Sequence, residues 1–269
     1  TTNAKSAALA SSTLKPYPHQ HFAVYGTMLP QPTLRFLLGD EPGTGKTIMG
    51  GLFAREAERL GLVSRCLVVC PAHLVSKWEA DFKRFFGGGL DRIENKTIKN
   101  KTFEYGLAAG QGFWVVSLEL AAMNSAVLEA LQPDRAGWDL VIVDEAHRMT
   151  PSAESYFAVG RILKEAPPFL AMSATPHRGN EYYFRALMHL VDPAIYPMPT
   201  KDEESAKVLA PGQIHLLRRM KEELTGYDGQ ELLFKKRIAA NLRVPLSKAT
   251  EKIVYEEALQ LVDSFFPDN

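Results

Sequence analysis

The sequence predicts an α/β fold in which a mostly parallel central sheet is flanked by helices. Short apolar runs alternate with longer helical patterns, which is typical of strand–helix–strand units. The apolar runs are nearly continuous in Val, Leu and Ile, as in strands that are buried on both faces. A Gly-Lys-Thr segment also stands between the first such run and a helical pattern, where a P-loop belongs.

Each element follows from these periodicities. The runs predicted as strands are Leu34–Leu38, Arg65–Cys70, Phe113–Ser117, Leu140–Val143 and Phe169–Met172. The segments predicted as helices are Lys46–Leu60, Leu74–Phe86, Leu118–Leu131, Ala153–Lys164 and Glu181–Leu190. Gly61 follows the first helix at the position of a helix-ending glycine.

The remaining segments are less regular. The glycine- and lysine-containing stretch from Gly87 to Thr102 is predicted to be either a flexible surface loop or an edge strand between loops. After Asp192 several prolines bracket a polar loop. Lys236–Leu246 is predicted as an extended strand and Lys248–Phe266 as an amphipathic helix.

The composition excludes some classes of protein and does not by itself indicate a function. Lys and Arg total 31, as do Asp and Glu, so no basic excess indicates a nucleic-acid partner. No apolar run is long enough to cross a membrane, and Thr1–Thr13 lacks the apolar region of a signal peptide. With only Cys66 and Cys70, the chain is predicted to be cytoplasmic, with both thiols in the core.

The segment Asp40–Thr47 has the order of a P-loop. Gly43 and Gly45 let the backbone curl so that its N–H groups face phosphate oxygens. Lys46 is expected to reach the β- and γ-phosphates of ATP, and the Thr47 hydroxyl to bind Mg²⁺. One residue departs from the pattern, because the first position is Asp where glycine is usual.

Two acidic residues end the fourth strand. In Asp144-Glu-Ala-His147 they are expected at the carboxyl edge of the sheet, beside the P-loop. Asp144 is predicted to hold Mg²⁺ and Glu145 to orient and deprotonate the attacking water. A helix start stabilised by two acids is the alternative, disfavoured by the position of the pair after a P-loop.

A third polar segment, Ser173-Ala-Thr-Pro176, ends the fifth strand. Ser173 and Thr175 are hydroxyl residues that can hydrogen-bond to His147 and to the acidic pair. With Ala174, they are predicted to couple the nucleotide state to a nucleic-acid face.

In this order, DEPGTGKT, DEAH and SATP resemble motifs I, II and III of superfamily-two helicases. The segments Leu14–Gln20 and Arg65–Glu79 are similar to the Swi/Snf-type translocases of that superfamily. Ser173–Gly179 and Arg218–Leu224 are closer to a bacterial branch. That branch includes the RNA-polymerase recycling factor and the Swi/Snf-like helicase of DISARM phage defence.

The resemblance implies a RecA-like P-loop NTPase lobe that uses ATP and Mg²⁺. Its implied nucleotide-binding residues are Gln20, Gly43, Thr44, Gly45, Lys46 and Thr47, with Gln20 on the adenine edge. The implied nucleic-acid contacts are Pro71, Ala72, His73, Ser117, His177 and Arg178. The basic clusters at residues 218–221 and 235–237 are expected either to line double-stranded DNA or to brace a hinge.

The resemblance also implies an organisation and partners. Residues 1–13 are expected to be disordered or an artificial extension, 14–225 to form the lobe, and 226–269 to lead to a second RecA-like lobe. That lobe would supply catalytic arginines, so this chain alone is expected to bind ATP but hydrolyse it weakly. Double-stranded DNA is the expected partner, with RNA polymerase or subunits of a defence complex. The alternatives are a non-motor ATP-sensing or scaffolding module and a restriction-enzyme motor subunit.

Overall fold

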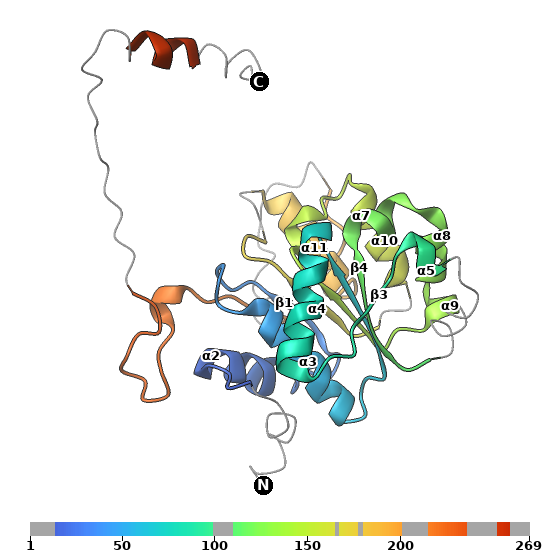
Figure 1. The fold of residues 1–269 in the computed structure, drawn as a ribbon, viewed down its shortest axis with the longest axis horizontal. Helices are drawn as coiled ribbons and strands as arrows, with labels where there is room; N and C mark the ends of the chain where they lie inside the picture. Colours follow the sequence, from blue (N-terminus) through green and yellow to red (C-terminus); the bar gives the residue numbers. More distant parts are fainter. Residues whose placement is uncertain are drawn as a thin grey trace. The chain divides into compact units, whose positions relative to one another are not determined.

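The computed structural model describes residues 14–98, 110–164, 167–176, 180–200, 215–235 and 252–258. The chain divides into two compact units, Thr1–Phe234 and Lys235–Asn269. The first unit contains the sheet (Figure 1), together with Asp40–Thr47, Asp144–His147 and Ser173. In the second unit, residues 252–258 are helical and exposed. The strand predicted over Lys236–Leu246 lies outside the described residues.

Seven strands of the described chain form one sheet in which every pairing is parallel. They are β1 (Arg35–Leu38), β2 (Arg65–Cys70), β3 (Asp91–Arg92), β4 (Gly112–Ser117), β5 (Leu140–Val143), β6 (Phe169–Met172) and β7 (Leu216–Leu217). Their order across the sheet is β3-β4-β2-β5-β6-β1-β7. The predicted α/β class with a largely parallel sheet is confirmed.

Helices cover both faces of the sheet (Figure 1). On one face lie η1 (Phe22–Met28), α3 (Lys46–Arg59) and α4 (Ala72–Phe86). On the other lie α7 (Leu118–Met123), α8 (Ser125–Ala130), α9 (Pro133–Ala136), α10 (Glu154–Ile162) and α11 (Glu181–Val191). The short elements are α2 (Pro18–His21), α5 (Asn95–Ile98), η2 (Ala146–Arg148) and η4 (Lys221–Glu223).

Alternation along the strands divides the core between the two faces. Leu67 and Val69 of β2 pack with α7–α11, whereas Cys66, Val68 and Cys70 pack with α3 and α4. The nearly continuous apolar strands are therefore explained by helices on both sides. Because all strands are parallel, their carboxyl ends share one edge, and the loops that follow β1, β2, β4, β5, β6 and β7 leave from it.

One predicted helix is wrong in extent. Leu118–Leu131 is two helices, because Asn124 has an extended backbone (φ −117°, ψ 106°) and its side chain accepts a hydrogen bond from Val127 N. Asparagine is a preferred N-cap residue, so it ends one helix and starts the next. Gly61 has the left-handed φ of 71° expected just after a helix.

Several short elements were not predicted or were left open. The stretch after Gly87 contains an edge strand, β3, so the edge-strand alternative holds there. The edge strand β7 and the short helices α2, α5, α9, η1, η2 and η4 were not predicted, because segments of two to seven residues are too short to show a periodicity.

Two tryptophans and both cysteines lie in the core. Trp114 and Trp138 are buried and meet edge to face, with the Arg65 guanidinium over both rings. Cys66 and Cys70 are buried and unpaired. Within the described residues, no helix is long and apolar enough to cross a bilayer.

Candidate nucleotide site

The P-loop joins β1 to α3 with two glycines in the left-handed region, Gly43 (φ 79°) and Gly45 (φ 88°). Only glycine adopts such angles without strain, so the loop can curl over the first turn of α3. Lys46 folds back and its Nζ donates to the carbonyl oxygens of Asp40 (2.7 Å) and Glu41 (3.1 Å). Burial lowers the pKa of Lys46, and the carboxylates of Glu145, Asp40 and Asp144 oppose this shift.

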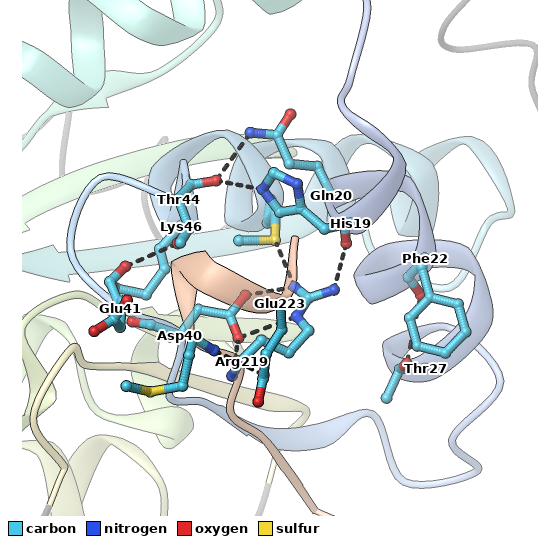
Figure 2. A network of polar contacts seen from close by, with 12 residues as sticks. His19, Gln20, Phe22, Thr27, Asp40, Glu41, Thr44, Lys46, Arg219 and Glu223 are labelled. Atoms are coloured by element: carbon cyan, nitrogen blue, oxygen red, sulfur yellow. Dashed lines mark hydrogen bonds and ion pairs between the residues drawn. The ribbon is translucent and has the colours of Figure 1, made fainter. Parts of the chain in front are cut away.

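The unusual Asp40 has a specific partner, as Figure 2 shows. Its carboxylate is fully buried and accepts hydrogen bonds from Arg219 N (2.9 Å), Nε (3.2 Å) and Nη2. Arg219 Nη1 also donates to the carbonyl oxygen of His19 (2.7 Å). The arginine therefore joins three distant segments, and a buried acid at the first P-loop position is neutralised by a cation from beyond β7.

Gln20 lies against the P-loop, in the segment predicted to recognise adenine. Its Nε2 donates to Thr44 O (3.0 Å), and its Oε1 accepts from Tyr17 N (3.0 Å). His19 Nε2 lies 2.9 Å from the same carbonyl oxygen, and burial lowers the pKa of this imidazole. The structure thus places Gln20 beside the P-loop. Its predicted contact with the adenine of a bound nucleotide stays a prediction.

The acidic pair lies at the end of β5. Asp144 is 5% exposed, and burial raises its pKa. Its Oδ2 accepts from the indole Nε1 of Trp78 (3.0 Å), and its Oδ1 accepts from Glu145 N (2.9 Å). Glu145 has a left-handed backbone (φ 50°, ψ 44°), an unfavourable conformation that is concentrated at functional sites.

A polar link runs from the acidic pair to the loop after β6. His147 Nδ1 lies 3.1 Å from Glu145 Oε2 and 3.0 Å from Ser173 Oγ. The hydrogen bond to His147 lowers the pKa of Glu145. Ser173 Oγ also accepts from Thr175 N (3.2 Å). The predicted contact between Ser173 and His147 is therefore present in the geometry, with Ala174 between the two hydroxyl residues.

Four of the predicted nucleic-acid contacts, Pro71, Ala72, His73 and Ser117, lie at the carboxyl ends of β2 and β4. Pro71 precedes α4, and Ala72 and His73 are exposed in its first turn. Ala72 N donates to Glu119 Oε2 (3.0 Å), so a carboxylate already lies at this helix start. Ser117 caps α7 by accepting from Leu120 N. His177 and Arg178 lie outside the described residues.

Sequence reasoning missed three participants. Trp78 was not assigned to the site, but its indole Nε1 donates a hydrogen bond directly to Asp144. Arg219 and Lys221 were assigned to a DNA track or a hinge, yet both reach the P-loop. The available signal was Asp40 itself, because a buried acid in a phosphate-binding loop requires a cationic partner.

The chain can now be compared with known proteins. Residues 13–178 match the family model described as type III restriction enzyme, res subunit. The chain belongs to that family. The matched region includes the P-loop, the acidic pair and the segment after β6, so these motifs lie in the family's shared domain.

Solved structures agree with this family at the level of fold. The Sulfolobus solfataricus SWI2/SNF2 ATPase core in complex with dsDNA is 17% identical to this chain in sequence, with a TM-score of 0.61. The match covers 78% of this chain and 45% of that chain. The SWI2/SNF2 ATPase core domain from the same organism is 18% identical, with a TM-score of 0.60. This match covers 78% of this chain and 44% of that chain. This res-family chain thus has the fold of a helicase-type RecA-like lobe and spans less than half the length of these two structures.

Proposed function

We propose that this chain is the ATP-binding motor lobe of a DNA-dependent ATPase that translocates on double-stranded DNA. One observation carries most weight: Lys46, Asp144, Glu145 and the His147–Ser173 link converge at one edge of a parallel sheet. The dsDNA-bound relative has the same fold and supports DNA as the partner. The predicted cytoplasmic location belongs to the same proposal.

The residues fit Mg-ATP. Mg²⁺ in nucleotide sites takes one or two protein oxygens and otherwise phosphates and water, which matches the Thr47 hydroxyl and the Asp144 carboxylate. When bound, the metal neutralises charge on the phosphates. Lys46 turns its ammonium into the loop, where a polyanion can replace the two carbonyl oxygens it now contacts.

Asp144 and Glu145 have different roles in this proposal. Glu145 is ionised, since its hydrogen bond to His147 lowers its pKa, and it orients and deprotonates the attacking water. The Trp78 indole fixes the Asp144 carboxylate. His147 contacts both Glu145 and Ser173, which gives the water-activating residue a direct connection to the loop after β6. A second lobe completes the site, so this chain by itself hydrolyses ATP weakly.

Calorimetry with ATP and Mg²⁺ tests the proposed binding of ATP. Lys46→Ala should abolish binding, whereas Glu145→Gln should retain it. In the full-length protein, duplex DNA should stimulate ATP hydrolysis and Glu145→Gln should stop it. The motor proposal is wrong if DNA gives no stimulation and Glu145→Gln leaves turnover unchanged.

The res-subunit match favours one alternative, the motor subunit of a restriction enzyme. The segment Arg218–Leu224 favours a bacterial Swi/Snf-like context instead, in phage defence or RNA-polymerase recycling. Co-purification of the full-length protein separates these contexts, because a DNA-modification subunit, a defence complex and RNA polymerase are different partners. A non-motor ATP-sensing or scaffolding role predicts ATP binding without DNA-stimulated turnover.

A further inference from the structure

The edge strand β7 continues along the P-loop beyond the end of β1. Gly39 N donates to Leu217 O (2.7 Å), and Glu41 N donates to Arg219 O (3.2 Å). The second of these bonds already involves a P-loop residue. The chain after β7 is therefore held parallel to the first residues of the loop, and its side chains are delivered to the phosphate-binding turn.

Lys221 follows directly and has two anchors. Its backbone N donates to Glu41 Oε2 (2.7 Å), which fixes its main chain against the loop. Its Nζ lies 5.2 Å from the centroid of the Phe234 ring, a cation–π contact. A Cβ added to Gly43 would stand 3.1 Å from this Nζ, so the ammonium group lies directly over the glycine turn.

The ammonium group of Lys221 has no salt-bridge partner in the part of the chain that the structure describes. Its charge also opposes that of Lys46, whose pKa is lowered first by burial and further by Lys221. Two cations held near one curled loop repel each other, and a polyanion between them removes that cost.

We propose that Lys221 is a second phosphate-binding cation of the P-loop, which contacts the phosphates of a bound nucleoside triphosphate together with Lys46. This inference rests on the proposed ATP-binding function and extends it to a residue far from the P-loop in sequence. It also gives the segment after β7 a role in the nucleotide site, in place of the predicted DNA track or hinge brace.

The test is calorimetry with ATP and Mg²⁺ on the 269-residue chain. Lys221→Met keeps an unbranched side chain of similar length and the backbone bond to Glu41 but removes the charge and its contact with the Phe234 ring. Losing one charge-assisted hydrogen bond should weaken ATP binding roughly 10- to 100-fold. Lys221→Arg should restore most of it. The matched control is Lys164→Met, which lies after α10 and before the start of β6, whereas the P-loop follows the end of β1; this variant should bind like the unaltered chain.

Three outcomes are decisive. Weaker binding in Lys221→Met, with unchanged thermal unfolding and rescue by Lys221→Arg, supports the inference. Unchanged ATP affinity in Lys221→Met, in a chain that loses binding with Lys46→Ala, overturns the inference and leaves the proposed function intact. No ATP binding by the unaltered chain refutes the proposed function, and the inference is lost with it.

Discussion

Removing one partner of the ion pair between Asp40 and Arg219 should cost far more stability than removing one partner of a surface pair. The Asp40 carboxylate is 0% exposed and the Arg219 side chain 14%. Arg219→Met would leave the carboxylate buried with only the Arg219 backbone N as donor, and would free the carbonyl oxygen of His19. Removing one partner of a buried pair costs about 3–5 kcal/mol in the free energy of unfolding.

Urea denaturation of the variants measures this cost. Arg135→Met is the reference, because Arg135 and its partner Glu129 are 50% and 62% exposed and such pairs contribute about 0–1 kcal/mol. Adding Asp40→Asn to Arg219→Met removes the unpaired charge, so the double variant should recover about 1–3 kcal/mol relative to the sum of the single changes. If Arg219→Met destabilises no more than Arg135→Met does, the buried-pair reasoning is wrong.

Three further predictions concern single sites. Burial raises the pKa of Asp144, so the folded state carries a cost for the ionised carboxylate above the unfolded pKa of about 4 and none below it. The free energy of unfolding of Asp144→Asn, relative to that of the unaltered chain, should therefore grow as pH rises from about 4 and level off above the pKa of Asp144 in the folded state. Urea denaturation at a series of pH values measures this difference. Gly45→Ala should cost more than about 1 kcal/mol in urea denaturation, because φ is 88° and the new Cβ would overlap Gln20 Nε2. Burial raises the pKa of both Cys66 and Cys70, so a thiol reagent at pH 8 should modify them in urea and not in the native chain.

The sheet was predictable where strands are long and apolar. β2, β5 and β6 have the predicted bounds, because four to six buried residues between helical patterns leave one reasonable assignment. The predicted position of Asp144 at the carboxyl edge agrees with the structure for the same reason. A strand of two residues such as β7 has no periodicity, and its formation depends on pairing with β1, which only tertiary structure provides.

The site was predictable as far as its motifs are contiguous. The P-loop, the acidic pair and Ser173 each follow a strand, so parallel topology alone brings them together. Arg219 and Trp78 were missed as site residues because their partners lie far away in sequence. A basic pair or a tryptophan gives no indication of which buried oxygen it will contact. Asp40 was noticed as a departure, but its pairing required the path of the chain after β7.

The position of β7 has a consequence for biosynthesis. Asp40 and Arg219 are separated by 179 positions. Arg219 therefore leaves the ribosome long after the P-loop, whose Asp40 it pairs with. At about 5–20 residues per second, the nascent P-loop waits on the order of ten seconds or more with its acid unpaired. Nucleotide affinity should therefore arise late in translation, once nearly the whole lobe has emerged. A stalled nascent chain that ends before β7 would retain less ATP than one that extends past Phe234.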